Sequence, residues 1–354
     1  MVRTLRMVDF RCWNTLALEM PECGGVFVGQ NAQGKTSILE AVCVLLRLQS
    51  PRTHKLQALV RFSQAGFGVA GEAWQMNRKV RYGKEGLRCE VEDELRDGSN
   101  AYLQDGGLVV WMGNEDLELV RGAGETRRRY LDFMGMQWKP EYRHHWSRYR
   151  RALKMKNMLL KERHIDERQL SAVEELMVAH GESLADLRTE MIGMLENWCK
   201  QLHQEVSGGI ESVSLLYQSA GSCSMRDSLR QAREREWRVR QSVIGPHRDD
   251  LLLRLNGLSA SEFASEGQQR TLALALKLAQ GALLQHERAR VPIYLLDDIF
   301  GELDAARRNA LMRALPAHAQ KWITTTSMGW LSDREDAYLN LPQFQVAEGR
   351  VSPP

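Results

Sequence analysis

Residues 26–41 read V-F-V-G-Q-N-A-Q-G-K-T-S-I-L-E-A, and this stretch decides the fold. A short apolar run ends at Gly29, and a loop follows as far as Gly34. From Lys35 onward, apolar residues recur at helical spacing. The pattern therefore predicts a strand, a loop and a helix in direct succession. Glycine, four residues and then Gly-Lys-Thr is the spacing of a phosphate-binding loop, which requires this structural context.

Each position of the predicted loop has a chemical role. Gly29 and Gly34 allow the backbone to curl so that successive N–H groups point at phosphate oxygens. Lys35 adds a mobile positive charge, and the Thr36 hydroxyl is a Mg²⁺ ligand. The predicted nucleotide-binding residues of this loop are Gly29, Gln30, Asn31, Ala32, Gln33, Gly34, Lys35 and Thr36.

Two adjacent acids supply what such a loop needs from elsewhere in the chain. The apolar residues I-Y-L-L at 293–296 form a predicted buried strand that ends in Asp297-Asp298. Paired carboxylates at the end of a buried strand are costly unless a cation or a proton compensates their charge. We expect Asp297 to bind Mg²⁺ opposite Thr36, and Asp298 to orient or deprotonate the attacking water. With Lys35, these two acids are the predicted catalytic residues.

A second phosphate-binding element is predicted at residues 264–270, which read A-S-E-G-Q-Q-R. This segment begins a strongly patterned helix that extends to His286. Ser265, the backbone of Gly267 and the positive end of the helix dipole favour an anion. Composition and spacing do not say which phosphate this element binds.

Composition excludes several classes of protein. The chain has 354 residues, 43% of them hydrophobic and 26% charged, enough for two domains or for one domain with a large insertion. Its six cysteines include no C-x-x-C pair, which favours reduced thiols over disulfides or a zinc site. The sequence has no membrane-length apolar run and no signal-peptide pattern. We therefore expect a cytoplasmic protein without a membrane partner.

Charge is concentrated in one segment of the chain. The formal net charge is +3, but residues 121–163 contain thirteen basic and four acidic residues. Within this segment, the spacing of Tyr142, Trp146, Tyr149 and Leu153 predicts one face of a helix, with cations over the remainder. Apolar residues from Leu170 to Trp198 alternate by three and four, a coiled-coil period. Two antiparallel helices packed as an arm are therefore predicted.

The remaining pattern predicts an α/β fold. Residues 4–10 and 15–20 form an expected hairpin, and β-prone pieces at 67–74, 79–82 and 87–91 form an expected antiparallel meander. The helical block then separates two halves of one α/β unit. Further strands are expected at residues 108–112, 213–217, 291–296, 322–325 and 344–346.

An ordered series of motifs resembles the ABC-type ATPase heads of the SMC and Rad50 class and, within it, the RecF recombination family. The series comprises G-Q-N-A-Q-G-K-T, G-N-E-D-L-E-L-V-R-G, T-R-R-R-Y-L-D, S-R-Y-R-R-A-L-K-M-K-N-M-L-L, G-P-H-R-D-D-L, S-E-G-Q-Q-R and L-L-D-D-I-F-G-E-L-D. The resemblance implies an ABC-type ATPase head with a mixed β-sheet and an antiparallel meander. Residues 1–112 and 242–354 would form the head, and residues 113–241 an inserted, coiled-coil-like helical arm.

The resemblance also implies a function. Two subunits would enclose two ATP molecules with Mg²⁺, each between one subunit's loop and the partner's signature residues Ser265, Gly267 and Gln268. It implies a weak, DNA-stimulated ATPase that binds single-stranded, duplex and gapped DNA at gaps and junctions. Its roles would lie in recombinational repair, replication restart and the SOS response, with RecR and RecO as partners and RecA loading downstream. Arg11 matches a basic residue near the nucleotide in related heads.

Several points remain open at the level of sequence. We expect DNA contacts from the arm residues Arg148, Arg150, Arg151, Lys154 and Lys156, whereas some arginines of T-R-R-R-Y-L-D are expected to pair with acids in the fold. Glu266 is unfavourable beside a phosphate unless it turns outward. Residues 324–327 read T-T-T-S, where transporter heads carry a histidine. The alternative is another ABC-type ATPase, a transporter-type or DNA-bridging protein that uses ATP as a dimer clamp.

Overall fold

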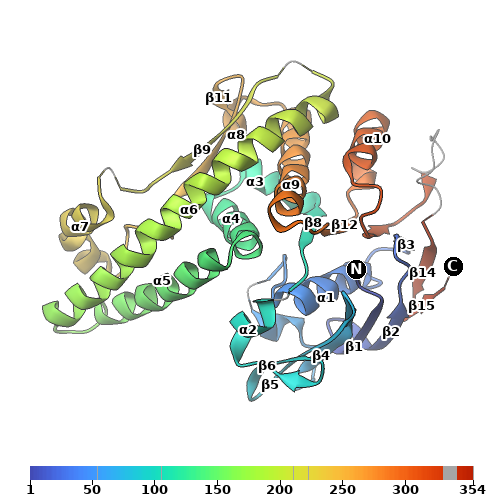
Figure 1. Cartoon of the computed structure of the whole chain (residues 1–354), viewed down its shortest axis with the longest axis horizontal. Helices are drawn as coiled ribbons and strands as arrows, with labels where there is room; N and C mark the ends of the chain where they lie inside the picture. The colour runs from blue at the N-terminus through green and yellow to red at the C-terminus, as the bar shows by residue number, and fades with distance from the viewer. Residues whose placement is uncertain (54, 105, 210, 222, 330–340, 354) are drawn as a thin grey trace. The chain divides into compact units, whose positions relative to one another are not determined.

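The predicted phosphate-binding loop follows the buried strand β3 (Gly24–Val28) and ends at helix α1 (Lys35–Arg47). In this computed structural model, residues 1–53, 55–104, 106–209, 211–221, 223–329 and 341–353 are described. The chain divides into two compact units (Figure 1). Unit 1 comprises Met1–Asp116 and Ala289–Pro354, and unit 2 comprises Leu117–Arg288.

A mainly parallel sheet in unit 1 gathers the predicted nucleotide residues at one edge. Its strand order is β15-β14-β3-β13-β12-β8, and only the pairing of β15 with β14 is antiparallel. Because parallel strands share a direction, the loop after β3 and the acids at the end of β12 lie along the same edge. The strands are β8 (Val109–Gly113), β12 (Ile293–Asp297), β13 (Lys321–Thr325), β14 (Gln343–Ala347) and β15 (Arg350–Ser352).

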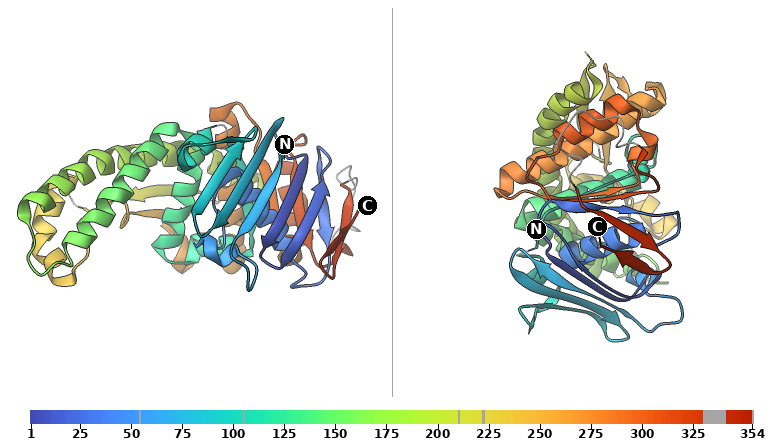
Figure 2. Two further views of the ribbon diagram at one scale, coloured as in Figure 1. Left: turned by 90° about the horizontal axis from the view of Figure 1, so that it is seen from below. Right: turned by 90° about the vertical axis from the view of Figure 1, so that its right-hand side faces the viewer.

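A second sheet of unit 1 is antiparallel, with the order β2-β1-β4-β5-β6-β7 (Figure 2). Helix α1 contacts strands of both sheets, and twelve of its thirteen residues are buried. A helix that is covered on all sides needs apolar residues around its circumference, which explains the run I-L-E-A-V-C-V-L-L. The strands are β1 (Thr4–Phe10), β2 (Trp13–Glu19), β4 (Phe67–Ala73), β5 (Met76–Gly83), β6 (Gly86–Val91) and β7 (Glu94–Leu95).

Short helices complete unit 1. The loop after β12 contains the 3-10 helix η3 (Phe300–Glu302), and helix α10 (Ala305–Ala314) then leads to β13. The side chain of Asp304 caps α10 by accepting a hydrogen bond from the backbone N of Arg307. The others are η1 (Leu56–Leu59), α2 (Gly98–Gln104) and η2 (Asn114–Asp116).

Unit 2 is built on two long helices, α5 (Pro140–Leu159) and α6 (Glu167–Ser207), which pack side by side (Figure 1). The apolar residues predicted for their seam, such as Tyr149, Leu153 and Leu170, are buried. Helix α6 continues through both of its glycines. At Gly181 an added Cβ would lie 2.5 Å from the sulfur of Met225, so a larger residue would require the Met225 side chain to move.

The rest of unit 2 packs around these helices. A three-stranded sheet has the order β11-β10-β9, with antiparallel pairing throughout. Helix α9 packs against α6, α4 and α3. The elements are α3 (Leu117–Arg121), α4 (Gly124–Trp138), β9 (Val213–Gln218), α7 (Met225–Val239), β10 (Asp250–Leu255), β11 (Leu258–Ser259), α8 (Ala260–Phe263) and α9 (Glu266–Arg288).

The expected hairpin, meander, buried strands and packed helices are all present, and the α/β prediction is confirmed. The boundary of the helical part differs from the expected one. The sequence pattern places residues 242–288 in the ATPase head, but they lie in the same compact unit as the helical segment. The reason is that α9 packs on α6 and α4, and β10 pairs with β9. Within the described residues, no helix has both the length and the apolar character needed to cross a membrane.

Candidate nucleotide site

The loop at residues 29–36 has the curled backbone expected of a phosphate cradle. Ala32 has a φ of 64° and Gly34 a φ of 91°, both in the left-handed region. A Cβ at Gly34 would lie 2.6 Å from Cys12 Sγ and 2.7 Å from Trp13 Nε1, so the hairpin of β1 and β2 packs directly on the loop. The Trp13 indole N–H also donates a hydrogen bond of 3.1 Å to Gly34 O. Sequence reasoning missed this support by Trp13.

The Lys35 ammonium lies inside the loop. Its Nζ donates hydrogen bonds to the carbonyl oxygens of Gly29 at 2.6 Å and Gln30 at 2.8 Å. Burial lowers the pKa of Lys35, whereas the carboxylates of Asp298 and Asp297 oppose that shift. An ammonium held by two neutral carbonyls is ready to exchange these partners for phosphate oxygens, which bind a cation more strongly.

Asp297 links the loop to the far end of the sequence. Its Oδ1 accepts hydrogen bonds from Thr36 Oγ1 at 2.8 Å and from Thr324 Oγ1 at 2.7 Å. Burial raises the pKa of Asp297, and these two hydroxyl groups oppose that shift. A hydroxyl and a carboxylate are hard oxygen ligands of the kind that Mg²⁺ takes together with phosphate oxygens and water. The predicted pair therefore fits a Mg²⁺ site.

Asp298 has a different environment from Asp297. Its backbone has a φ of 52°, and its N–H donates a 3.0 Å hydrogen bond to Thr324 Oγ1. Burial raises the pKa of its carboxyl group, Lys35 opposes the shift and Glu302 adds to it. A raised pKa suits a group that takes a proton from water. The two acids thus differ in their partners, although burial raises the pKa of both.

Thr324 and Asn114 were not predicted as site residues. Thr324 contacts both acids because β13 pairs in parallel with β12, with Thr324 opposite Asp297. Asn114 follows β8 on the other side of β12, and its Nδ2 lies 3.5 Å from Asp298 O. Both residues lie at or just beyond the carboxyl ends of strands that the sequence predicted at residues 322–325 and 108–112. A search of these strand ends could therefore have identified both positions.

The other loop residues occupy the surface of the cradle. Gln33 Oε1 accepts a 2.9 Å hydrogen bond from the backbone N of Glu348, which joins the loop to the turn between β14 and β15. Gln30, Asn31 and Ala32 are exposed, so their backbone is accessible to a phosphate group.

The guanidinium group of Arg11 is held by partners within the fold. Its Nε and Nη2 donate hydrogen bonds of 2.8 and 2.7 Å to the buried carboxylate of Glu40, and Nη1 donates one of 2.8 Å to Ala58 O. All three guanidinium nitrogens therefore have protein partners. Arg11 neutralises a buried acid of α1, and this geometry gives the predicted nucleotide contact no support.

In unit 2, the start of α9 forms a capping box. Gln268 N donates to Ser265 Oγ at 3.3 Å, and Ser265 N donates to Gln268 Oε1 at 2.7 Å. The Gln268 side chain also donates to Glu211 Oε1 at 2.6 Å, so its amide is already satisfied. Glu266 is exposed and pairs with Arg270 at 2.8 Å, which is the outward orientation that the sequence required. Gly267 follows in the first turn of the helix.

The motifs T-R-R-R-Y-L-D and G-P-H-R-D-D-L support one another. Arg127 makes a bidentate contact with Asp250 at 2.8 and 2.7 Å, and Arg128 donates a 2.9 Å hydrogen bond to Asp249 O. Arg188 of α6 donates to Pro246 O at 2.7 Å. The prediction that arginines of the first motif pair with acids in the fold is confirmed for Arg127.

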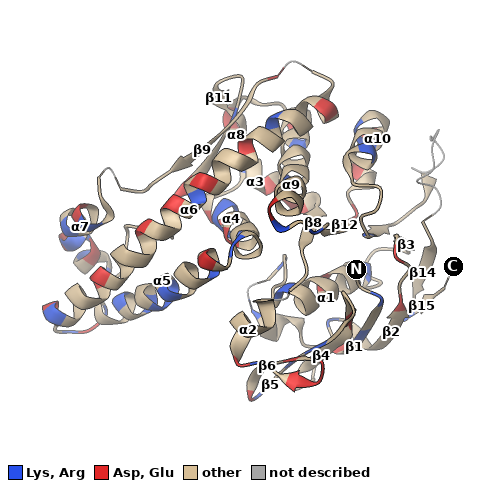
Figure 3. Ribbon diagram, viewed as in Figure 1, with Lys and Arg blue, Asp and Glu red and all other residues tan. Residues whose placement is uncertain are grey.

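Lys and Arg residues recur along α5 (Figure 3), and several of them are exposed. Arg148, Arg150, Arg151 and Lys154 are exposed, as predicted for DNA contacts. The prediction for Lys156 is wrong, because its side chain is 0% exposed and pairs with Glu174 and Glu236. Lys156 follows the buried Tyr149 by two helical turns and therefore lies on the packed face.

Comparisons with known proteins bear on the family of this chain. No family model matches the chain. The DNA replication and repair protein RecF of Lactococcus lactis subsp. cremoris (strain MG1363) is 32% identical over 360 residues, covering 99% of this chain and 98% of that protein. The protein of the same name from Shouchella clausii (strain KSM-K16) is 33% identical over 372 residues, again covering 99% and 98%.

Solved structures that resemble this chain also include a RecF protein. The structure of the recombination mediator protein RecF-ATPrS in the RecFOR pathway superimposes with a TM-score of 0.88 at 26% identity, covering 100% of this chain and 98% of that chain. An Smc head bound to the C-winged helix domain of ScpA shares the fold, with a TM-score of 0.54 at 13% identity. The chain therefore belongs to the RecF family of DNA replication and repair proteins.

Proposed function

We propose that this chain is an ATP-binding ATPase of recombinational DNA repair, which binds ATP and Mg²⁺ at Gly29–Thr36 and Asp297. The observation that carries the proposal is the 2.8 Å hydrogen bond between Thr36 and Asp297, 261 residues apart in sequence. It joins the two predicted Mg²⁺ ligands beside the ammonium of Lys35. The RecF-ATP structure of a related protein gives independent support for ATP as the ligand.

Each residue then has a defined task in hydrolysis. Lys35 would exchange its two carbonyl partners for β- and γ-phosphate oxygens, and Thr36 and Asp297 would hold Mg²⁺, which would supply charge neutralisation for the phosphates. Asp298 accepts the proton of the attacking water, helped by the burial that raises its pKa. We propose that turnover is slow and DNA-stimulated, and that the protein acts at gaps and junctions with RecR and RecO to help load RecA.

The proposed site needs a second subunit. Ser265 and Gly267 open a helix N-terminus that suits the γ-phosphate bound by another copy of the chain. We therefore propose an ATP-driven homodimer in which each ATP contacts the loop of one subunit and the α9 start of its partner.

Ser265→Arg tests this dimer. The variant is expected to bind ATP as a monomer with unchanged affinity but to fail to dimerise, because a bulky cation occupies the place of the partner's phosphate. Sedimentation with a slowly hydrolysed ATP analogue measures the dimer fraction. Ser171→Arg, at an exposed serine of α6, is the matched control and is expected to dimerise normally. Normal dimerisation of Ser265→Arg would exclude the two-subunit site.

DNA binding is proposed for the exposed cations of α5. Arg148, Arg150, Arg151 and Lys154 have no salt bridge within the described residues, and Arg150 lies 5.5 Å from the centre of the Trp146 ring. Contacts between these cations and DNA phosphates would neutralise charge without reading the bases. Binding of DNA should therefore be insensitive to its sequence and should weaken steeply as the salt concentration rises.

Charge reversal at Arg150 and Lys154 tests the proposed DNA face. The double variant is expected to bind duplex and gapped DNA more weakly and to retain basal ATPase activity. The slope of affinity against salt should be flatter by about one unit for each phosphate that is no longer neutralised. Reversal of Arg81 and Arg88, which are exposed on the sheet of unit 1, makes the same change in net charge. If both double variants bind DNA equally weakly, only net charge matters and α5 is not the DNA site.

A further inference from the structure

Helix α7 covers the arm with a polar surface. Of its fifteen residues only Ser228, Leu229 and Glu236 are fully buried, and Leu229 is the one apolar residue among these three. Met225 and Trp237 add half-buried apolar contacts. Full burial of one leucine contributes only about 2 kcal/mol. The helix therefore depends largely on polar contacts to remain on α6.

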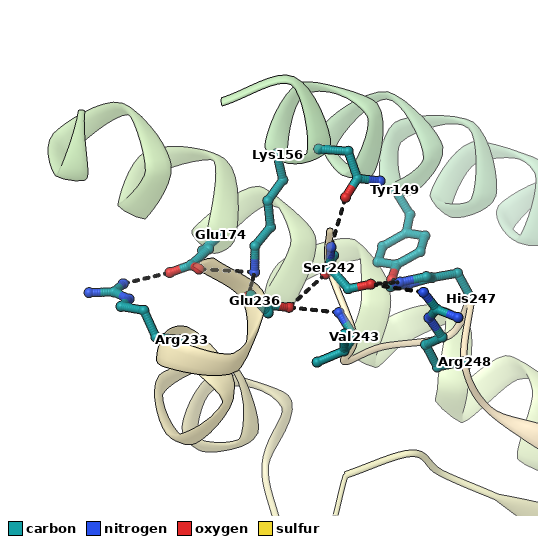
Figure 4. Close-up of polar contacts among 10 residues, drawn as sticks. Tyr149, Lys156, Glu174, Arg233, Glu236, Ser242, Val243, His247 and Arg248 are labelled. Atoms are coloured by element: carbon teal, nitrogen blue, oxygen red, sulfur yellow. Dashed lines mark hydrogen bonds and ion pairs between the residues drawn. The ribbon is translucent and has the colours of Figure 1, made fainter. Parts of the chain in front are cut away.

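Buried charges supply these contacts (Figure 4). Lys156 Nζ of α5 lies 2.6 Å from Glu236 of α7 and 3.0 Å from Glu174 of α6. Arg233 of α7 pairs with the same Glu174 at 2.7 Å. The side chains of Lys156, Glu236 and Glu174 are 0%, 1% and 9% exposed. The two cations and two carboxylates balance, so the cluster has no net charge while α7 is docked.

The same cluster holds the segment that follows α7 (Figure 4). Glu236 Oε1 accepts hydrogen bonds from Ser242 Oγ at 2.9 Å and from Val243 N at 2.8 Å. Ser242 O in turn accepts a 3.1 Å hydrogen bond from His247 Nε2. Burial lowers the pKa of His247 to about 4, so the ring is neutral at pH 7. Its Nδ1 then accepts the 2.6 Å hydrogen bond from Tyr149 OH.

Charged contacts and apolar contacts respond differently to opening. Burying ions removes their hydration free energy, and the attraction between the ions must offset this loss. The hydration free energy is regained when the element opens and water returns to the ions. Apart from the Lys156–Glu174 pair, the α5–α6 seam is mainly apolar, with Tyr149, Leu153 and Leu170 buried, and exposing such residues to water recovers nothing. Few apolar contacts and a solvent-facing surface are the marks of an element that opens below the global unfolding free energy.

We propose that residues 225–248 form a releasable strap, able to open while α5 and α6 stay packed. The Lys156–Glu236 pair latches its helix on the arm, and contacts with Arg188 and Tyr149 hold its last residues. The strap leads directly into Asp249 and Asp250, which bind Arg128 and Arg127 of α4. Opening of the strap therefore loosens the connection between the arm and α4.

Hydrogen exchange of the full-length chain tests the strap. Peptides from residues 225–248 are expected to exchange faster than peptides from the packed faces of α5 and α6. Lys156→Met leaves Glu174 paired with Arg233 alone and removes the cation that pairs with the buried Glu236, and it should accelerate exchange in residues 225–248 by about 100-fold or more. Exchange in α5 and α6 should remain unchanged. Lys154→Met, an exposed lysine one half-turn away, is the matched control and should change neither region.

A second variant separates the latch from general damage to the arm. Adding Glu236→Gln to Lys156→Met removes the unpaired carboxylate, so the double variant is expected to open less than Lys156→Met. Equal acceleration of α5, α6 and α7 by Lys156→Met would overturn the proposal. The unmutated chain provides a test that does not depend on variant folding, since one common exchange rate for all three helices would also overturn the proposal.

Discussion

Replacing Lys35 with methionine is expected to abolish ATP binding or to lower ATP hydrolysis by at least about 10²-fold. The ammonium lies within hydrogen-bond distance of two loop carbonyls, Gly29 O and Gln30 O, and is the cation of the phosphate cradle. Methionine has a similar length and no charge, so the loop keeps its packing but loses the interaction that offsets phosphate desolvation. Binding of a fluorescent ATP analogue and phosphate release measure the two effects.

The matched control is Lys84→Met, which removes an exposed lysine from a turn of the same unit. It should leave ATP binding and hydrolysis unchanged. Burial disfavours the charged form of Lys35, so the methionine variant is expected to fold with normal thermal stability. Near-normal turnover by a folded Lys35→Met protein would contradict the assignment of Gly29–Thr36 as the nucleotide loop.

The sequence was sufficient to predict the positions of those residues that must lie at fixed intervals from a strand. Glycine, Lys35 and Thr36 must follow a strand at fixed intervals, and Asp297 must end a second buried strand. A parallel sheet then brings the two strand ends to one edge without any further information. The hydrogen bond between Thr36 and Asp297 is the result.

Side-chain partners from distant segments could not be predicted in the same way. Arg11 resembles a nucleotide contact in sequence, but its partner Glu40 is a buried acid 29 residues away. Lys156 is a different case, because the sequence did contain the relevant signal. It lies seven residues after Tyr149, whose inward orientation was correctly predicted, and the density of neighbouring cations hid that spacing. For Lys156, the helical period predicts burial of the side chain more reliably than its charge predicts exposure.

The boundary of the helical unit also depended on contacts that no local pattern contains. The start of α9 carries a phosphate-binding motif, which suggested the ATPase head. The long apolar face of α9 packs against α6. Strand β10, which follows α7 in the sequence, pairs with β9, which precedes α7. Compactness follows these long-range contacts, so residues 242–288 group with the helices.

Asp298→Asn is expected to separate ATP binding from hydrolysis. Thr36 and Asp297 remain, so ATP and Mg²⁺ should bind with near-normal affinity. Hydrolysis should fall by about 10²-fold or more, because an amide cannot take a proton from water. The wild-type rate should also fall as the pH drops through the raised pKa of Asp298, since protonation removes the base.

Asp297→Asn provides the contrast within the same pair of acids. Its carboxylate accepts from Thr36 and Thr324, so this variant should lose Mg²⁺-dependent ATP binding as well as turnover. Titration of Mg²⁺ at fixed ATP distinguishes the two variants. If Asp298→Asn loses binding while Asp297→Asn keeps it, the two acids have the opposite roles. If both variants bind ATP and retain hydrolysis, neither carboxylate serves the reaction, and the base must come from another residue at this edge of the sheet.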